Sequence, residues 1–353
     1  MSYMQGTILF FSLFLIGITG ILIFDLLVLG RKSHEVSLRE ASIWTSVWVM
    51  LAFLFALFLR FHGQMIHGIE THEELSLVLH KYYPYLAAGQ GSFQEELDLL
   101  RKSITLNYIS GYLVEESLSI DNLFVIMAIL KAFSVRKTDY KRVLFWGILG
   151  AIIMRFIFIF AGTALINRFE WLLYVFGAYL LYVGVKMYLE RNKDQQIRPQ
   201  DHPVVRFLSK RVNIFPRYVN DRFFIRKDHK VYITPLFVVL IMIELTDLIF
   251  AMDSIPAVFG ITRDPYVVFF SNIFAILGLR SLFFLLIKIV DRFYLLKVGV
   301  SLLLVFVGLK LIAHEWLDHI GYKPVYSLFV IATILVLSIV LSMLIPKQTK
   351  QDA

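Results

Sequence analysis

The sequence predicts an all-α, polytopic membrane protein, and both its composition and its apolar runs support that fold class. Hydrophobic residues make up 58% of the 353 residues, whereas charged residues make up only 18%. A soluble domain of this length carries more charge and is not assembled from apolar runs of about twenty residues. We therefore expect the chain to cross a bilayer several times as helices.

About nine segments are long enough and apolar enough to cross a bilayer, which requires about 20 residues in a helix. They are expected at residues 7–29, 41–60, 105–130, 143–166, 170–189, 233–259, 266–287, 294–313 and 325–345. Two longer polar stretches, 61–104 and 190–232, interrupt this series.

Basic residues give the expected orientation of these spans. Most of the 35 Lys and Arg residues fall in segments that nine spans would place on one side, namely 30–40, 131–142, 186–232, 288–297 and the tail. Cytoplasmic loops carry such an excess of positive charge, so we expect the N-terminus outside and the C-terminus inside. The formal charge of +8 then faces anionic lipid. Lipid is the expected partner of this surface, and nucleic acid is not.

The polar interruptions divide the chain into six predicted parts. These are two N-terminal helices (1–60), an extracytoplasmic loop rich in acids and His (61–104), a first three-helix repeat (105–190), a basic cytoplasmic loop (191–232), a second three-helix repeat (233–313), and a last helix with a cytoplasmic tail (324–353).

The repeat is indicated by three pairs of polar or small residues that recur at similar offsets. The pairs are Glu115 through Asp121-Asn122 with Asp247 through Asp253-Ser254, Arg155 with Arg280, and Gly184 with Gly308. A three-helix unit crosses the membrane an odd number of times, so its copy must be inverted. Inverted repeats with a substrate site at their interface are typical of secondary transporters.

Charged residues inside the predicted spans are the main indication of function. Seven carboxylates and two arginines fall there: Asp25, Glu115, Glu116, Asp121, Glu244, Asp247, Asp253, Arg155 and Arg280. Each charge at mid-membrane costs about 2.5–3.5 kcal/mol on insertion scales. A salt-bridge network with the two arginines is the structural alternative, but it leaves most of the acids unbalanced. We therefore expect these groups to face an ion.

Helical spacing suggests which side chains meet. Glu115, Ser119 and Asn122 share one helix face at about 100° per residue. Asp247 and Ser254 share a face of the sixth span, with Glu244 one turn earlier.

Asp121 and Asp253 point about 120° away from these faces on an ideal helix. They would join the others only where the helix is broken. Pro256 cannot donate to the carbonyl of Met252, so we expect a local break in the sixth span.

The available donors narrow the ion. The chain has no Cys, and its nine His lie outside the predicted spans or at their edges. An all-oxygen site suits Mn²⁺, Ca²⁺ or Mg²⁺, and a nearby methionine would favour Mn²⁺. The predicted metal ligands are Glu115, Asp121, Asn122, Glu244, Asp247, Asp253 and Ser254. Pathway or charge-compensating roles are predicted for Asp25, Glu116, Ser119, Arg155, Met252 and Arg280.

Three stretches of the sequence resemble the TerC family, and within it the Alx-like manganese exporters. They run from Gly111 to Asn122, from Ile243 to Ala257, and from Ser271 to Arg280. The resemblance covers most of the chain, with a remoter likeness to LysE-type transporters. It implies efflux of a divalent metal across the inner membrane of a bacterium, and it implies that Asp25 lies on the pathway.

These observations favour a secondary transporter that exchanges Mn²⁺ for protons and holds no prosthetic group. No nucleotide-binding loop of the G-x-x-x-x-G-K type occurs, and no His lies in the membrane to activate a serine, so we do not expect an enzyme. The alternative is a membrane scaffold or metal sensor in a stress complex. The acids and histidines of 61–104, including His62, His67 and His72, either capture metal or form a solvated face.

Overall fold

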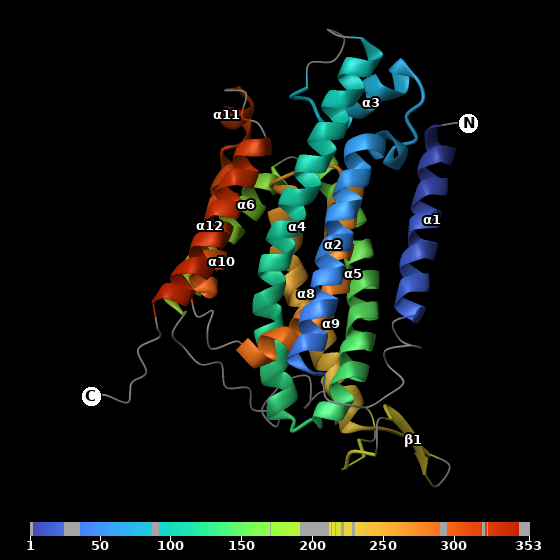
Figure 1. Cartoon of the computed structure of the whole chain (residues 1–353), viewed down its shortest axis with the longest axis vertical. Coiled ribbons are helices and arrows are strands. Elements are labelled where there is room, and N and C mark those ends of the chain that lie inside the picture. Colours follow the sequence, from blue (N-terminus) through green and yellow to red (C-terminus); the bar gives the residue numbers. More distant parts are fainter. Residues whose placement is uncertain are drawn as a thin grey trace.

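The computed structural model describes residues 3–24, 36–86, 92–169, 171–190, 212, 214–215, 217–219, 222–227, 230–289, 295–319, 322 and 324–345. Most of these residues are helical, and the long helices lie side by side along one axis (Figure 1). The short helix α3 lies at one end of this bundle and the β-hairpin at the other, and we refer to them as the α3 end and the hairpin end. The predicted fold class, an all-α polytopic membrane protein, is confirmed, whereas the number of spans and their orientation stay predictions.

The long helices are α1 (Tyr3–Phe24), α2 (Leu38–His62), α4 (Phe93–Ala132), α5 (Tyr140–Arg168), α6 (Leu172–Leu189), α8 (Pro235–Phe259), α9 (Pro265–Ile289), α10 (Leu296–Ile312) and α12 (Pro324–Leu344). Shorter elements are η2 (Gly63–Ile66), α3 (His72–Tyr82), η3 (Lys137–Asp139) and α11 (His314–His319). The strands β1 (Phe224–Lys227) and β2 (Lys230–Ile233) pair antiparallel.

Six helical segments of the described residues are long and apolar enough to cross a membrane: Leu38–Ile66, Lys137–Ile166, Leu172–Leu189, Pro235–Phe259, Pro265–Ile287 and Tyr326–Leu344. Two shorter apolar stretches, Gly6–Ile21 and Val298–Ile312, belong to α1 and α10. Helix α4 is long enough, at 40 residues. It is not among the six because its apolar part carries three carboxylates, Glu115, Glu116 and Asp121.

Helix α4 begins earlier than the sequence pattern predicts. Its first residue is Phe93 rather than a residue near 105, so residues 93–104 belong to a helix and not to a loop. The cause is a capping box: the Ser92 side chain accepts a hydrogen bond from the backbone of Glu95 at 3.4 Å, and the Glu95 carboxylate accepts from the backbone of Ser92 at 2.9 Å.

The helix break expected at Pro256 does not occur. Helix α8 continues through this residue to Phe259, and α4 likewise continues through Asp121. Pro256 lies in the last turn of α8, so its missing N–H removes one hydrogen bond close to a helix end and does not interrupt the segment that carries Asp247. The prediction of unwound backbone beside the carboxylates was therefore wrong.

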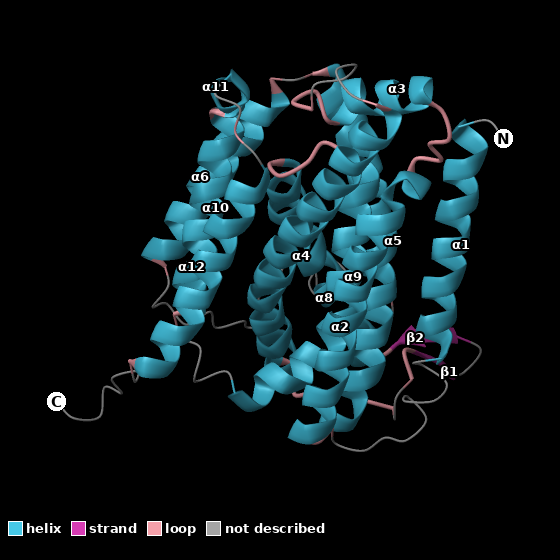
Figure 2. Ribbon diagram, turned by 45° about the horizontal axis from the view of Figure 1, so that its top comes forward, coloured by secondary structure: helices cyan, strands magenta, loops and turns pink. Residues whose placement is uncertain are grey.

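Helices α4, α5, α8 and α9 form the centre of the bundle, and α9 is the most buried of the candidate spans. Helix α2 covers α4 and α9, while α6, α10 and α12 form the opposite flank (Figures 1 and 2). The helix contacts occur in corresponding pairs: α4 packs on α9, and α5 packs on α8.

Helices α6 and α10 form another contact between the two predicted repeats, and their backbones approach closely. A Cβ on Gly177 would lie 2.8 Å from the Gly308 carbonyl oxygen, and a Cβ on Gly184 would lie 2.9 Å from that of Ser301. Glycine at these places lets two backbones approach more closely than larger residues allow. Gly184 and Gly308 are one of the pairs that indicated the sequence repeat.

In the segment around α3, His62, Glu70, His72 and Glu73 are exposed, as a solvated face requires, whereas His67 departs from both predictions. His67 is fully buried and lies 2.7 Å from the Asp264 carboxylate, which also accepts a hydrogen bond from the Tyr83 hydroxyl at 2.7 Å. The Thr71 and Glu74 side chains cap α3. His67 is therefore neither on a solvated face nor in a cluster of the described His, Asp and Glu residues that could hold a metal.

Candidate functional site

Arg155, near the middle of α5, joins side chains from three other helices. Its guanidinium donates through Nη1 to the Glu115 carboxylate of α4 and, at 2.7 Å, to Oδ1 of Asn272 on α9. Its Nη2 donates to Oδ1 of Asp247 on α8 at 3.5 Å. Arg155, Glu115 and Asn272 are fully buried, and the Asp247 residue is 8% exposed. We call these four residues the Arg155 cluster.

The carboxylates of this cluster are only partly bonded. Glu115 Oε2 and Asp247 Oδ2 are buried and have no hydrogen-bond partner among the described residues. The same is true of nearby polar atoms on the same two helices, namely Ser119 Oγ, Asn122 Nδ2 and Ser254 Oγ. A buried polar group without a partner costs about 1–3 kcal/mol, so these atoms keep bonding capacity that water or a bound ligand can use.

The structure thus brings together Glu115 and Asp247, the two acids that the sequence repeat had matched. Ser119 and Asn122 are buried on α4, and Ser254 is buried on α8. Asp121, Asp253 and Met252 lie within continuous helices, but their side chains are outside the described structure, and so is the whole of Asp25. Their predicted roles remain predictions.

Two other predicted acids contact glycines of neighbouring helices. Glu244 packs its carboxylate against α5 at Gly150, where an added Cβ would lie 2.1 Å from a Glu244 oxygen. Glu116 faces α9 near Gly278, with one oxygen 3.9 Å from the position of a Cβ there. Neither is among the described side chains that bond to Arg155, so the structure does not join them to the cluster.

Among the described residues, no group of three or more His, Cys, Asp and Glu side chains is placed to hold a metal ion. Glu115 and Asp247 supply two carboxylates, with hydroxyl and amide groups beside them. A hard cation takes about six or more oxygen ligands, so a complete shell needs further donors such as water or the side chains of Asp121 and Asp253.

A small cavity adjoins Asp247. Its volume is about 20 Å³, and its lining includes Asp247, Arg280 and apolar side chains of α4, α5, α8 and α9. A space of this size holds about one water molecule. Arg280 also lines a second cavity of about 20 Å³, together with Glu40 and Lys141. Arg280 therefore lies between Asp247 and residues near the start of α2 and α5.

Asn272 is a member of the cluster that sequence reasoning missed as a site residue. Its side chain is fixed at both ends, because Nδ2 donates to the Val268 carbonyl at 3.0 Å while Oδ1 accepts from Arg155. The available signal was the polar pair Ser271-Asn272 in the middle of an apolar helix. An amide there is costly unless it is bonded.

The chain matches the model of the integral membrane protein TerC family over residues 100–350, and it belongs to that family. This range contains every residue of the Arg155 cluster. The family defines an integral, multi-pass membrane protein, in agreement with the helices described above.

Relatives match along nearly the whole chain. A Salmonella typhi protein named "Putative membrane-bound redox modulator Alx" is 40% identical over 96% of this chain and 94% of its own length. The protein of that name in Escherichia coli K12 is 38% identical over 96% and 95%. An "Uncharacterized membrane protein STKORF319" of Myxococcus xanthus is 39% identical over 94% and 91%. No solved structure matches.

Proposed function

We propose that the chain is a secondary transporter that exports a divalent metal ion from the cytoplasm, with Mn²⁺ as the first candidate. The supporting observation is the pair Glu115 and Asp247, which share one guanidinium and keep one unpartnered oxygen each. They come from α4 and α8, the matching helices of the proposed repeats. A purely structural ion pair would be expected to use both oxygens, because an unbonded buried carboxylate oxygen is costly.

The chemistry of the donors supports a hard ion. Carboxylate, hydroxyl and amide oxygens suit Mn²⁺, Ca²⁺ and Mg²⁺, and the absence of Cys removes the ligands that soft metals prefer. Asp121, Asn122, Glu244, Asp253 and Ser254 complete the proposed ligand set. Mn²⁺ is the proposed cargo, and Ca²⁺ is the ion to test beside it.

Arg155 acts in this proposal as a tethered cation. In the structure the guanidinium occupies the space between Glu115 and Asp247 and balances part of their charge. A divalent ion that binds the same two carboxylates must displace it, because two cations cannot share one buried site without repulsion. Arg155 would return when the metal leaves and so keep the empty site from remaining uncompensated.

Protons are the proposed counter-ion. Burial disfavours charge, so carboxylates that release a metal can take up protons and carry them in the opposite direction. This gives the carrier a driving force without a nucleotide, in line with the absence of a G-x-x-x-x-G-K loop.

The corresponding pairs of helix contacts support an inverted repeat. When two copies of a unit are related by a twofold axis, a contact between two different helices of that unit occurs twice. The contacts of α4 with α9 and of α5 with α8 fit this arrangement, because α4 corresponds to α8 and α5 to α9 in the proposed repeats. We therefore propose repeats at 105–190 and 233–313, about nine spans, and an N-out, C-in orientation in the bacterial inner membrane. The hairpin end is then cytoplasmic, and the Arg280 cavities are the proposed route from there to Asp247.

The names of the relatives suggest a second reading, in which the protein modulates redox state. This chain contains no Cys, so it has no thiol with which to exchange disulfides. A scaffold or metal-sensor role remains the alternative function. Much of the basic segment that would recruit partners, 191–211, lies outside the described residues.

Everted membrane vesicles test the proposal. With an imposed pH gradient, vesicles that contain the wild-type chain should accumulate Mn²⁺, and the Asp247→Asn variant should not exceed vesicles without the protein. Collapsing the gradient should stop accumulation. Ca²⁺ is measured in parallel to assign the ion. Folded wild-type protein that moves neither ion would reject the transporter and favour the sensor.

A further inference from the structure

Glu244 carries a carboxylate that bonds to no other described side chain. It lies on α8 one turn before Asp247, on the hairpin side, because α8 begins next to the β-hairpin and runs toward the α3 end (Figure 1). The residue is partly buried, and no hydrogen bond or ion pair joins its oxygens to the described residues. These oxygens therefore keep bonding capacity that water or a cation can use.

Gly150 of α5 leaves the space that this carboxylate occupies. A Cβ on Gly150 would lie 2.1 Å and 2.2 Å from the two carboxylate oxygens of Glu244 and 2.3 Å from its carboxyl carbon. These distances are far below van der Waals contact, so any other residue at this position would displace the carboxylate. A Cβ on Gly147, one turn earlier, would lie 3.3 Å from a methyl group of Ile243. The close fit at Gly150 thus concerns the carboxylate and not the whole α5–α8 contact.

Neither the backbone nor helix stability explains a glycine at position 150. Gly150 lies inside α5, and among the described glycines a positive φ occurs at Gly68 and not here. Glycine is less favourable than alanine in the interior of a helix. The space beside the α5 backbone is therefore what glycine supplies at this position.

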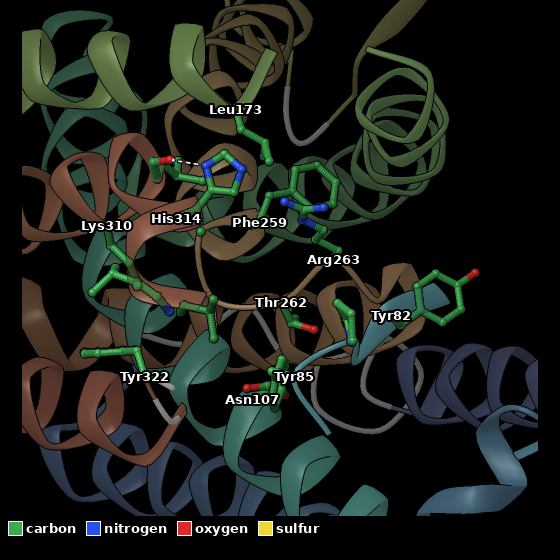
Figure 3. Close-up of a pocket in the computed structure, with 15 residues that line it drawn as sticks. Tyr82, Tyr85, Asn107, Leu173, Phe259, Thr262, Arg263, Lys310, His314 and Tyr322 are labelled. Carbon is green, nitrogen blue, oxygen red and sulfur yellow. Dashed lines mark hydrogen bonds between the residues drawn. The ribbon is translucent and has the colours of Figure 1, made fainter. Parts of the chain in front are cut away.

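The two ends of the bundle present different groups to a cation. At the α3 end, the side chains of Arg263, Lys310 and His314 line a pocket of about 110 Å³, and no Asp or Glu is among its described lining residues (Figure 3). On the hairpin side, Glu244 precedes Asp247 along α8, and a small cavity adjoins Asp247. An ion that approaches from the hairpin end therefore meets the Glu244 carboxylate before that of Asp247.

We propose that Gly150 positions the Glu244 carboxylate on the cytoplasmic side of the Arg155 cluster, where this carboxylate takes up the metal ion and passes it to Asp247. This role rests on the proposed function, in which the chain exports a metal ion and the hairpin end is cytoplasmic. Side chains three residues apart on a helix are neighbours, with about 5–6 Å between their Cβ atoms. One divalent ion can therefore contact both carboxylates during the transfer.

Initial rates of Mn²⁺ uptake into everted vesicles, measured over a range of Mn²⁺ concentrations, test this role. In Gly150→Ala the KM should rise about tenfold or more, the loss expected for one charge-assisted contact to the ion, with a maximal rate close to that of wild type. The unfolding temperature without metal should not fall, because the displaced carboxylate ends a flexible side chain. Gly17→Ala is the matched control, since nothing lies within 4 Å of a Cβ there.

Glu244→Gln shows whether Gly150 acts through the carboxylate. Glu244→Gln should raise the KM, and Gly150→Ala should add little to it in the double variant. A wild-type KM in Gly150→Ala, or independent effects of the two substitutions, would overturn the positioning role while Mn²⁺ transport itself stands.

Wild-type vesicles that accumulate no Mn²⁺ would instead reject transport, and the entry role with it. The positioning role is then decided by thermal stabilisation of the purified full-length chain with Mn²⁺. The Mn²⁺ concentration at half-maximal stabilisation should be higher in Gly150→Ala than in wild type and Gly17→Ala. Equal midpoints, or no stabilisation of wild type, would reject it.

The side of entry is tested with Glu244→Cys, which introduces a single thiol into a chain that has none. A membrane-impermeant thiol reagent should label this variant faster in everted vesicles, which expose the cytoplasmic face, than in right-side-out vesicles. Equal or slower labelling in everted vesicles, or none in either, would overturn the entry role.

Discussion

Asp264 and Asp247 are both buried aspartates beside a basic side chain, yet their surroundings differ. Asp264 accepts hydrogen bonds from His67 and Tyr83 at 2.7 Å on one oxygen and from the backbone of Tyr266 at 3.0 Å on the other. Asp247 has one oxygen at 3.5 Å from Arg155 and a second without a partner among the described residues.

The difference distinguishes a buried carboxylate with fixed structural bonds from one that can exchange its bonding partner. Both oxygens of Asp264 are bonded, so this residue ties the segment around α3 to the start of α9. The carboxylate of Asp247 keeps bonding capacity that the chain does not use. Burial is common to both sites, and the completeness of bonding is what separates a structural acid from a candidate ligand.

The largest expected effect on stability is at Asp264. Asp264→Asn removes the charge that His67 faces and an acceptor that Tyr83 uses. Breaking a buried pair of this kind costs about 3–5 kcal/mol. Asp247→Asn should cost clearly less, because its contact to Arg155 is long. Thermal unfolding of both variants in one detergent checks the order, and an equal loss would contradict the comparison.

Arg155→Gln should lower stability by a similar amount, about 3–5 kcal/mol, but only without metal. The variant leaves Glu115 and Asp247 without their cation, and bound Mn²⁺ should supply one. Added Mn²⁺ should therefore raise the unfolding temperature of the variant more than that of wild type. Arg142→Gln, on the same helix, is the control and should show no such gain. Equal gains in all three proteins would refute the tethered-cation role.

Acid should remove the contribution of Asp264. Burial by itself raises the pKa of this carboxyl, but the charge of His67 and the hydrogen bonds from His67, Tyr83 and the Tyr266 backbone outweigh burial and lower it below 3.8. A pKa lowered by folding stabilises the protein above the unfolded value of about 3.9 and ceases to do so as pH falls through the folded value.

The stability difference between wild type and Asp264→Asn should accordingly be present at about pH 5 and shrink below about pH 4. Unfolding temperatures of both proteins across this range measure it. A difference that grows as the pH falls would mean that the carboxylate is not held in its charged form.

The smallest expected effect is at Asn272. Asn272→Ala removes one acceptor of Arg155, and the loss should be about 1–3 kcal/mol. Its residual Mn²⁺ transport should exceed that of Asp247→Asn, because Asn272 positions the guanidinium and is not a proposed ligand. Vesicle uptake per folded protein compares the two, and a complete loss in Asn272→Ala would make this residue a ligand.

Much of the fold could be predicted because long runs of apolar residues directly indicate membrane-spanning helices. The predicted span 233–259 corresponds to α8 at Pro235–Phe259, for example. The early start of α4 was missed although Ser92 and Glu95 form a recognisable capping box, because the polar first turns hide the helix from a hydropathy pattern. The predicted orientation and the number of spans remain predictions.

The candidate site could be predicted only in part. Glu115 and Asp247 were found because charge is rare and costly in apolar segments. The bond between His67 and Asp264 joins residues 197 positions apart, and no local pattern records such a pairing. Asn272 was overlooked because a single amide in an apolar helix gives a weaker signal than a charge.

The most direct test compares neighbouring carboxylates on α4. Glu115 contacts Arg155, whereas Glu116 faces Gly278 on another side of the helix. Mn²⁺ uptake into everted vesicles is measured for Glu115→Gln and Glu116→Gln at matched amounts of folded protein. We expect uptake to fall to background in Glu115→Gln and to stay close to wild type in Glu116→Gln. Full uptake in Glu115→Gln would contradict the claim that the Arg155 cluster is the metal site.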